Sequence, residues 1–358
     1  MAEQPEPRCL IAAGGTAGHV LPAIAVGEAL RDRGAAVTFA GSPDRVEARL
    51  VPEAGFELDS FPISGLPRRP GVELVRSIFR AGGAVRESRR ILKRRRPDVV
   101  LGAGSYVAGP MVLAAATMRI PTALTEADAH LGLANRLAAP FAERVFLSYE
   151  LDGRGPPKYL VVGRPIPKRS RPLPRAEARQ RLGLPQDGKI LGVFGARAGA
   201  KSLNEFAVET WGESGPVVLH ISGERDHDEL RPRVGRANYH LLPTLEDFGA
   251  ALSAVDLALS RSGGTVWELA AAGLPAVLVP YRHATSDHQT KNARYFERGG
   301  GAVVVPEPRL SEAAAIVESL LTDDARLQAM GDAMRALAKE DAADRIAEEV
   351  LELAAAHR

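Results

Sequence analysis

Short apolar stretches alternate with longer amphipathic stretches along the first half of the chain. The apolar stretches have the length of buried strands, and they are CLIAA, AAVTFA, FELDSF, DVVLG, PTALT and RVFLS. The stretches between them predict helices over residues 19–33, 43–53, 72–95, 106–118 and 131–138. Such regular alternation predicts a parallel sheet that is covered by helices on both faces.

The alternation is interrupted once and then resumes. Residues 162–179, VGRPIPKRSRPLPRAEAR, contain prolines among basic residues, and proline stiffens the chain and removes backbone donors. This segment therefore predicts a linker between two domains. Six later stretches predict a second parallel α/β domain: KILGVFG, PVVLHIS, NYHLLP, DLALS, PAVLVP and GAVVV. Residues 340–357, rich in Ala and Glu, predict a final helix.

We therefore expect an α/β protein with two Rossmann-like domains, each built on a parallel sheet. The first domain is expected over residues 1–163 and the second over residues 164–339, and a C-terminal helix over 340–358 is expected to pack back on the first domain. In open α/β sheets, ligands bind outside the carboxyl ends of the strands. Two such domains facing each other predict a cleft with one substrate on each wall.

Composition and charge narrow the class of protein further. A chain of 358 residues suits two domains, and 45% hydrophobic with 25% charged residues is typical of soluble globular proteins. The net charge of +2 gives no reason to expect a nucleic-acid partner. Cys9 is the single cysteine, which excludes an intrachain disulfide, and its apolar surroundings predict a buried thiol. Without signal-peptide features or a long apolar run, we expect a cytoplasmic protein whose membrane contact is peripheral.

The first of three glycine-containing turns follows the strand CLIAA and precedes a helix. Gly14, Gly15 and Gly18 would let a phosphate approach the backbone, and the helix N-terminus adds free N–H groups and partial positive charge. A tight turn that binds no ligand is the alternative. The stretch is not GxGxxG, and no acidic residue follows the second strand, which disfavours a nicotinamide cofactor.

The second turn, in VFGARAGAKSLNEF, repeats this arrangement in the second domain. Arg197 and Lys201 could bind a diphosphate, or they could simply be surface charges at a turn. In the third turn, LSRSGGTVWELAAAGLP, the glycines precede a helix whose first turn carries Thr265 and Glu268. A carboxylate there could accept hydrogen bonds from a ribose diol, or it could serve as a favourable helix-terminus charge.

Five motifs, taken in order, resemble those of the MurG family of bacterial N-acetylglucosaminyltransferases, which is glycosyltransferase family 28. They are GGTAGHVLPA, GSYVAGP, GARAGA, RSGGTVWELAAAGLPAVLVP and HQTKNA, and they span nearly the whole chain. The resemblance implies a GT-B fold with a deep interdomain cleft. It also implies inverting transfer of GlcNAc from UDP-GlcNAc to the C4 hydroxyl of MurNAc in undecaprenyl-diphospho-MurNAc-pentapeptide (lipid I), which gives lipid II in peptidoglycan synthesis.

The resemblance implies roles for residues of the first domain. His19 matches a histidine proposed as the base or as an acceptor contact, and neutral imidazole suits the removal of a hydroxyl proton. A structural role in capping the turn is also open. Tyr106 matches a tyrosine near the acceptor and joins His19 as a candidate catalytic residue. The implied donor contacts are Thr16, Ala17, Gly18 and Asp128, and the implied acceptor-diphosphate contacts are Gly14, Gly15 and His19.

In the second domain the resemblance implies most of the UDP-GlcNAc site. Glu268 matches the residue that binds the uridine ribose, Gln289 the residue that binds the GlcNAc hydroxyls, and Leu245 a backbone contact to uracil. Asn292 is expected to support the turn that carries Gln289. The other implied donor contacts are Arg197, Gly264 and Thr265.

Three positions depart from the family pattern. Asp128 stands where the family usually has asparagine, Arg197 where it has a phosphate-contacting serine, and Pro167 where an arginine is common. These departures leave the reaction class intact, but they leave open whether the donor is a different nucleotide sugar.

No metal or cofactor is expected. Asp226, His227 and Asp228 resemble the DxD motif of metal-dependent transferases, but they lie in ERDHDEL, which we interpret as a charged surface turn. Helix N-termini and basic residues can stabilise a leaving UDP without a bound cation.

The segment from ISGLPRR to KRRRPDVV combines apolar and basic residues. Leu74, Val75, Ile78 and Phe79 share one helical face among arginines. This pattern fits either a core-facing helix with a basic outer side or a helix that docks on an anionic membrane. Because the acceptor implied by the resemblance is lipid-linked, we expect docking on the anionic inner leaflet, and hence a peripheral protein at the cytoplasmic face of the bacterial cell membrane.

Three other functions remain to be distinguished. A UDP-GlcNAc 2-epimerase and a natural-product glycosyltransferase share the two-domain fold, and the first of these would need acid–base carboxylates and no lipid acceptor. A sugar-nucleotide-binding subunit that needs a partner is the non-enzymatic alternative. The first glycine turn and the basic apolar segment favour transfer to a lipid-linked acceptor.

Overall fold

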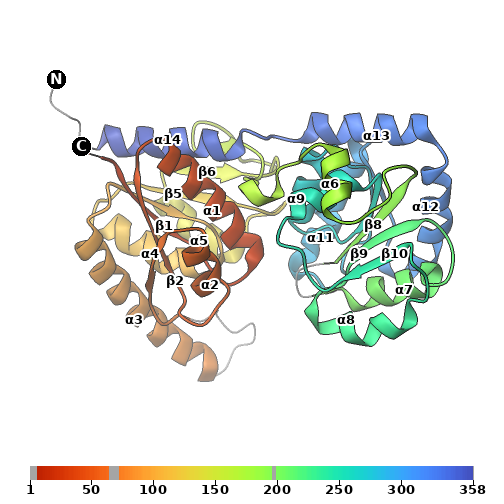
Figure 1. Ribbon diagram of the computed structural model, residues 1–358. Helices are drawn as coiled ribbons and strands as arrows, with labels where there is room; N and C mark the ends of the chain where they lie inside the picture. Colours follow the sequence, from red (N-terminus) through yellow and green to blue (C-terminus); the bar gives the residue numbers. More distant parts are fainter. Residues whose placement is uncertain (1–5, 64–71, 196–198, 358) are drawn as a thin grey trace. The chain divides into compact units, whose positions relative to one another are not determined.

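The computed structural model describes residues 6–63, 72–195 and 199–357, and the side chains of residues 72–81 and 285 are outside the description. The chain divides into two compact units (Figure 1). Unit 1 consists of Met1–Pro167 together with Lys339–Arg358, and unit 2 is the continuous segment Lys168–Ala338. The first boundary falls inside the proline-rich segment, and the second lies just before the final helix.

Unit 1 is built on a sheet of seven parallel strands in the order β3-β2-β1-β4-β5-β6-β7. In the register of this sheet, Cys9 of β1 lies between Val37 and Val99 of its two neighbours, and its thiol is buried as expected. The strands are β1 Arg8–Ala12, β2 Ala36–Gly41, β3 Glu57–Ser60, β4 Val99–Gly102, β5 Thr122–Glu126, β6 Arg144–Leu147 and β7 Tyr159–Val161. The sequence pattern missed β7.

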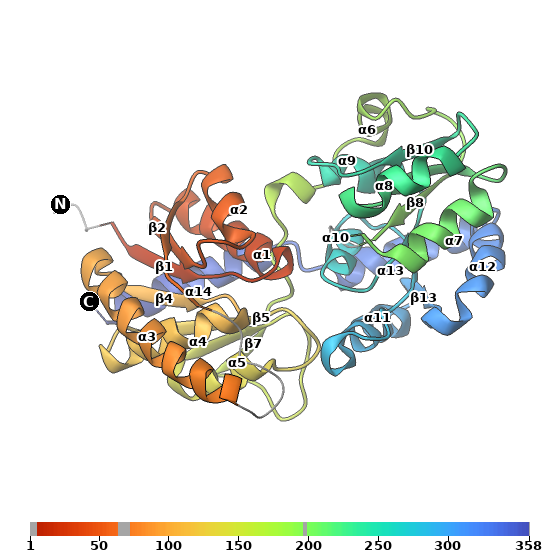
Figure 2. The same ribbon diagram turned by 90° about the horizontal axis from the view of Figure 1, so that it is seen from below.

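Helices cover both faces of this sheet, as the strand pattern predicts. Cys9 and Ile11 of β1 pack in one core cluster with the buried faces of α1 and α14, whereas Leu10 and Ala12 point to the other face, toward α3 and α4. Figure 2 shows these two layers on either side of the strands. The helices are α1 Ala17–Asp32, α2 Glu47–Glu53, α3 Val72–Arg95, α4 Ser105–Thr117, α5 Leu133–Ala138, the 3₁₀ turn η1 Ala139–Phe141, and α14 Ala342–Ala356.

Unit 2 repeats the architecture with six parallel strands in the order β10-β9-β8-β11-β12-β13. The strands are β8 Ile190–Phe194, β9 Val217–Ile221, β10 Tyr239–Leu242, β11 Leu257–Ser260, β12 Ala276–Leu278 and β13 Ala302–Val304. The helices are α6 Arg175–Arg181, α7 Lys201–Trp211, α8 Glu224–Leu230, α9 Phe248–Ala254, α10 Thr265–Ala271, α11 His288–Arg298, α12 Ala313–Leu321 and α13 Asp324–Leu337. Short 3₁₀ turns are η2 Lys168–Ser170, η3 Arg231–Arg233, η4 Thr285–Asp287 and η5 Glu307–Glu312.

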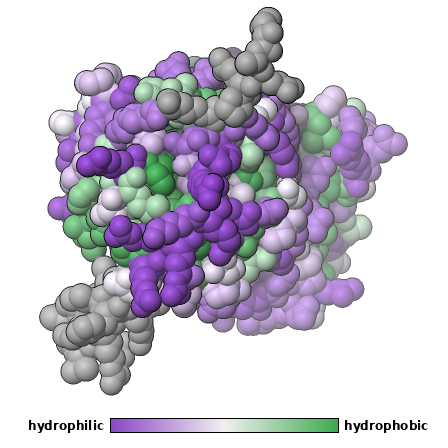
Figure 3. Space-filling view, turned by 90° about the vertical axis from the view of Figure 1, so that its left-hand side faces the viewer, coloured by the Kyte–Doolittle hydropathy of each residue, from purple (hydrophilic) through white to green (hydrophobic). Residues whose placement is uncertain are grey.

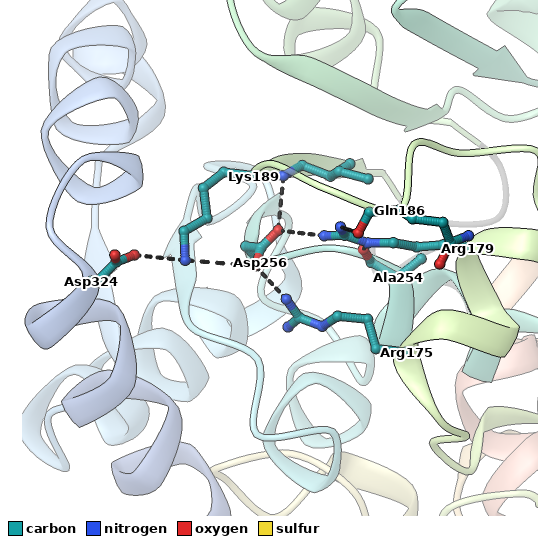
Figure 4. Close-up of polar contacts among 8 residues, drawn as sticks. Arg175, Arg179, Gln186, Lys189, Ala254, Asp256 and Asp324 are labelled. Atoms are coloured by element: carbon teal, nitrogen blue, oxygen red, sulfur yellow. Dashed lines mark hydrogen bonds and ion pairs between the residues drawn. The ribbon is translucent and has the colours of Figure 1, made fainter.

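The proline-rich segment is not a linker along its whole length, because its second half folds as part of unit 2. Arg179 of α6 is buried and pairs with the buried Asp256 at 2.9 Å, and Arg175 pairs with the same carboxylate (Figure 4). Asp256 also accepts a hydrogen bond from the backbone N–H of Ile190 at the start of β8. Basic residues that we assigned to a linker therefore anchor α6 to the sheet, because a buried carboxylate needs such partners.

The expected surface turn ERDHDEL is also corrected, because it forms helix α8. Asp226 is buried there, and its carboxylate accepts hydrogen bonds from Arg225 and from Asn204 Nδ2. The run of charged residues suggested an exposed turn. In the folded domain, however, the buried carboxylate of Asp226 has its hydrogen-bond partners within the protein.

Both sheets place their topological switch point beside the first strand of the unit. In unit 1 it lies between β1 and β4, and in unit 2 between β8 and β11. The loops that leave the carboxyl ends of these four strands carry the motifs GGTAGH, GSYVAGP, GARAGA and RSGGTVWE. The fold therefore delivers the glycine loops to the positions where open α/β sheets bind ligands.

Candidate active site

The first glycine loop of unit 1 is held by a buried carboxylate. Glu47, fully buried at the start of α2, accepts hydrogen bonds from the backbone N–H groups of Gly15 and Ser42, both at 3.0 Å. A Cβ on Gly14 would lie 2.3 Å from Glu47 Oε1, and Gly15 has a φ of +87°. Glycine is required at both positions, and a Glu within the apolar pattern RVEARLV was the overlooked signal.

His19 lies on the first turn of α1, and its ring is fixed from two sides. Nδ1 is 3.0 Å from Thr16 Oγ1, and Thr16 is the residue that precedes the helix. A Cβ on Gly104, in the loop after β4, would lie 2.8 Å from His19 Cδ2. The structure therefore brings the loops after β1 and β4 together around this imidazole.

Tyr106 lies beside the same loop. A Cβ on Gly15 would lie 3.2 Å from Tyr106 Cε1 at the start of α4. Partial burial raises the pKa of Tyr106, and the negative charge of Glu47 raises it further. The phenol therefore keeps its proton at neutral pH, which makes it a hydrogen-bond donor rather than a base.

Two residues that the sequence analysis did not select organise the loop that carries Asp128. Glu126 is buried at the end of β5 and accepts hydrogen bonds from the backbone N–H groups of Asp128 and Gly132 and from Asn135 Nδ2. Burial raises the pKa of Glu126 despite these bonds. The guanidinium of Arg164 donates to the carbonyl oxygens of Ala127 and Gly18, which ties this loop to the first turn of α1.

In unit 2 the candidate contacts for a nucleotide sugar gather around the loop after β11. Gly264 precedes α10, Thr265 begins it, and Glu268 lies on its first turn. Ser170 Oγ, which is buried, donates to Glu268 Oε1 at 2.6 Å. The carboxylate is therefore oriented by a hydroxyl group of the same unit.

Gln289 is joined to that loop through its backbone and its neighbours. Ser262 Oγ donates to the Gln289 carbonyl at 2.8 Å, and Asn292 Nδ2 donates to the Ser262 carbonyl at 3.2 Å. The Gln289 side chain accepts a hydrogen bond from the backbone N–H of Tyr281 at 3.0 Å. The expectation that Asn292 supports this turn is confirmed.

Arg261 is a further residue that sequence reasoning missed in this loop. Its buried guanidinium donates to Ser202 Oγ, to Glu307 Oε1 and to the Val279 carbonyl, so it links segments that follow β8, β11, β12 and β13. Burial alone would raise the pKa of Glu307, but the bonds from Ser202 and Arg261 hold it below its ordinary value. Arg261 lies within the motif LSRSGG, directly before the residues Ser262, Gly263 and Gly264.

Some expected site residues are not placed with these clusters. Arg197 lies outside the described residues, and so do the side chains of Leu74, Val75, Ile78 and Phe79, although α3 spans their backbone. Leu245 lies in the loop between β10 and α9, with a partly exposed side chain.

The described part of the chain contains no group of three or more His, Cys, Asp or Glu side chains arranged to hold a metal ion. Asp226, the first residue of the DHD triplet, is engaged with Arg225 and Asn204 instead.

A cavity of about 500 Å³ in unit 2 lies away from these clusters. Its lining includes residues at the amino ends of β8, β11 and β12, namely Lys189, Val255, Asp256 and Pro275. Figure 4 shows Lys189 and Asp256 among them. The glycine loops leave the opposite, carboxyl ends of the strands, so this cavity is separate from the candidate nucleotide-sugar site.

Two Rossmann-like units, each with a glycine loop at its switch point, define a GT-B-type enzyme of nucleotide-sugar chemistry. Two family models match the chain: the glycosyltransferase family 28 N-terminal domain over residues 9–147 and the C-terminal domain over residues 190–346. The chain therefore belongs to glycosyltransferase family 28.

Individual relatives agree with this assignment over almost their whole length. The chain is 35% identical over 346 residues to the UDP-N-acetylglucosamine–N-acetylmuramyl-(pentapeptide) pyrophosphoryl-undecaprenol N-acetylglucosamine transferase of Halothermothrix orenii, covering 91% of this chain and 93% of that protein. The crystal structure of Acinetobacter baumannii MurG matches with a TM-score of 0.78 and 28% identity, over 97% of this chain and 100% of that one.

A UDP-GlcNAc 2-epimerase, the alternative enzyme considered from the sequence, is also a structural neighbour. The UDP-GlcNAc 2-epimerase of Neisseria meningitidis, solved with UDP-GlcNAc bound, matches with a TM-score of 0.70 over 97% of this chain and 100% of that chain, but at 15% identity. A likeness at that identity shows a shared fold and leaves the reaction to be decided by the site.

Proposed function

We propose that this enzyme transfers GlcNAc from UDP-GlcNAc to the C4 hydroxyl of MurNAc in undecaprenyl-diphospho-MurNAc-pentapeptide, with inversion, and so makes lipid II. The observation that carries the proposal is the 35% identity, over more than nine-tenths of both chains, to a relative named for this transfer. Both family domains are present in one chain, which argues against a binding subunit that needs a partner.

Unit 1 supplies the acceptor side in this proposal. The N-terminus of α1 binds the acceptor diphosphate, because free N–H groups and the helix dipole favour anions there. Gly14 and Gly15 let the diphosphate approach the loop closely, and the Gly15 N–H, which is bonded to Glu47, fixes the loop shape. His19, with Nδ1 engaged by Thr16, takes the C4 proton or positions the hydroxyl group. Tyr106, whose raised pKa keeps it protonated, donates a hydrogen bond to the acceptor.

Unit 2 supplies the donor side. Glu268 accepts hydrogen bonds from the ribose hydroxyls while Ser170 holds its carboxylate, and Gln289 binds the hydroxyls of GlcNAc. The remaining donor contacts of the proposal are Gly264, Thr265, Arg197 and the Leu245 backbone in unit 2, with Thr16, Ala17, Gly18 and Asp128 in unit 1. Helix N-termini and basic side chains stabilise the departing UDP, and the proposal includes no resident metal or cofactor.

An assay of product formation tests this function directly. Labelled UDP-GlcNAc is incubated with the protein and a lipid I analogue, and the products are separated and identified. Label in a disaccharide-containing lipid supports the proposal. Acceptor-independent conversion of UDP-GlcNAc to its 2-epimer would show the epimerase reaction instead, and transfer only to other alcohols would show a natural-product transferase.

We further propose that unit 1 docks on the anionic cytoplasmic leaflet of the bacterial membrane. Within the described residues, no helix is long and apolar enough to span a bilayer. Three large apolar side chains, spaced four residues apart along α5 and η1, are exposed: Leu133 and Leu137 by 60% each and Phe141 by 50%. Exposed apolar side chains of this size mark a contact surface. Figure 3, which views the left-hand side of Figure 1, shows that hydrophobic areas beside a hydrophilic band also occur on that face.

Helix α3 supplies the positive charge for docking, although fewer of its basic residues are available than the sequence suggests. Arg94 and Arg95 pair with Asp59 of β3. Burial alone would raise the pKa of Asp59, but these hydrogen bonds hold it below its ordinary value. Arg89 and Lys93 are exposed on the same helix, and each basic residue near an anionic surface contributes about 1 kcal/mol.

Flotation with liposomes tests the docking surface. Wild type is expected to float with vesicles that contain phosphatidylglycerol and not with neutral phosphatidylcholine vesicles. The variant pairs Leu133→Ser with Leu137→Ser, and Ile78→Ser with Phe79→Ser, are each expected to weaken binding. Unchanged flotation of both pairs would contradict this docking site without affecting the transfer reaction measured on a soluble analogue.

A further inference from the structure

Helix α1 contains a proline that leaves one backbone carbonyl without its helical donor. In an α-helix the carbonyl of residue i accepts a hydrogen bond from the N–H of residue i+4. The residue four positions after Gly18 is Pro22, which lies inside α1 and has no N–H. The Gly18 carbonyl, on the turn that carries His19, therefore needs a donor from elsewhere in the molecule.

Arg164 supplies that donor. Its Nη2 donates to the Gly18 carbonyl, and its Nη1 donates to the Ala127 carbonyl at 3.2 Å. The Arg164 residue is 6% exposed, so both bonds form away from bulk water. One guanidinium thus joins the first turn of α1 to the residue that precedes Asp128.

The charge of Arg164 gives this link a second consequence. Among the described residues, the structure pairs this guanidinium with carbonyl oxygens and with no carboxylate. A cation at the positive end of a helix is unfavourable by itself and becomes favourable when an anion binds there. The positive charge of Arg164 and the N-terminus of α1 would therefore both favour binding of a negatively charged group nearby.

We propose that Arg164 is a positioning residue of the transfer reaction. It holds the turn that carries His19 and the loop that carries Asp128 in one geometry, so that the acceptor contact and the donor contact keep their positions relative to each other. This inference rests on the function proposed above. An arginine is needed because a planar fork can donate to two carbonyls at once, whereas a lysine ammonium is a flexible point charge.

The test compares Arg164→Met and Arg164→Lys with a matched control, Arg33→Met. Arg33 also uses its guanidinium as a fork, but at the far end of α1, where it bonds Asp344 and Glu348 of α14. For Arg164→Met we expect kcat on the order of 10- to 100-fold lower with the lipid I analogue, because small misplacements of reacting groups are costly. KM for UDP-GlcNAc should change less than kcat. Arg164→Lys should restore little of kcat, and Arg33→Met should retain it.

Hydrogen–deuterium exchange provides a readout that does not depend on the substrate. Peptides that cover residues 15–20 and 126–132 are expected to exchange faster together in Arg164→Met and to be unchanged in Arg33→Met. Unchanged exchange in both peptides, or full restoration of kcat by Arg164→Lys, would overturn the proposal. Absence of transfer by wild type would instead overturn the proposed function, while the exchange result would still decide whether Arg164 links the two loops.

Discussion

The first glycine loop of unit 1 and the glycine loop after β11 in unit 2 are held in different ways. In unit 1 the loop rests on the buried carboxylate of Glu47, and the candidate substrate contacts are largely backbone atoms. In unit 2 the candidate contacts are side chains, Glu268 and Gln289, which already accept hydrogen bonds that orient them. Substitutions should therefore act through loop shape in unit 1 and through individual ligand contacts in unit 2.

The largest expected effect is that of Gly14→Ala, set against Gly263→Ala. A Cβ on Gly14 would lie 2.3 Å from Glu47 Oε1 and 2.8 Å from Val107 Cγ2, whereas the nearest atom to a Cβ on Gly263 is Gln289 Nε2 at 3.9 Å. We expect Gly14→Ala to lower the free energy of unfolding by about 3 kcal/mol and to abolish transfer. Gly263→Ala should remain folded with near wild-type stability. Urea unfolding and the transfer assay measure both, and equal effects of the two changes would contradict the comparison.

The next largest effect is expected for Glu47→Gln. The amide keeps the volume of the carboxylate but can accept only one of the two backbone N–H bonds, so one buried donor loses its partner. We expect a loss of about 2 kcal/mol in the free energy of unfolding, with a lower kcat, because the GGTAGH loop loses its support. Glu53→Gln at the exposed end of α2 is the control. A variant with wild-type stability and turnover would show that the loop does not depend on this carboxylate.

Acidification should change the contributions of two buried groups, one in each unit, in opposite directions. Burial, with a smaller contribution from His227, lowers the pKa of His220 in unit 2 to about 3. The folded state keeps His220 neutral while the unfolded state binds a proton below its ordinary pKa near 6.5. Stability is therefore lost as pH falls from 6.5 toward 3, by at most about 1.4 kcal/mol per pH unit. The raised pKa of Glu126 in unit 1 has the opposite sign, since its contribution is lost as pH rises through the folded-state pKa.

The variant His220→Gln tests this dependence. Urea unfolding of the full chain between pH 7 and pH 5 should show a smaller loss of stability for His220→Gln than for wild type. His283→Gln, at an exposed position, should retain the wild-type slope. A slope unchanged by His220→Gln would assign the acid sensitivity to other groups.

The smallest expected effect is that of Ser170→Ala on the donor site. Loss of the hydroxyl group that orients Glu268 should weaken binding of UDP by about 1 kcal/mol, which is about a fivefold increase in Kd. Ser253→Ala is the control, because Ser253 bonds Leu173 and Gly249 elsewhere in unit 2. Titration calorimetry with UDP measures the difference. Equal Kd values for wild type and Ser170→Ala would remove the proposed role of this hydroxyl group.

The sequence predicted the elements more completely than the contacts that hold the site together. Hydrophobic patterning located twelve of the thirteen strands that the described residues form, because burial on a sheet face imposes a local periodicity. The helix over 72–95 was placed with its observed bounds. Glu47, Glu126, Arg164 and Arg261 were missed. Glu47, Arg164 and Arg261 each bond a segment more than 30 residues away, and hydrophobic periodicity does not mark such a partner. Glu126 bonds residues within its own loop, but as a charged residue at the end of a strand it gave no sign that it is buried.

The proline-rich segment over residues 162–179 is a second case in which the sequence indicated the element but not its contacts. Prolines and arginines indicated an exposed connection, and the unit boundary does fall within that segment. The buried Asp256 that binds Arg175 and Arg179 lies about 80 residues later, so the sequence did not show that these two arginines anchor α6 to the sheet of unit 2.

The placement of α14 in unit 1 has a consequence for synthesis of the chain. Ile346, Val350 and Leu353 complete the core that α1 and the central strands share, yet they are among the last residues to be made. Unit 2, a continuous segment, is entirely synthesised before them. On the ribosome, unit 2 should therefore be able to fold while unit 1 still lacks one wall of its core, and a truncation before Lys339 should leave unit 1 as the aggregation-prone part.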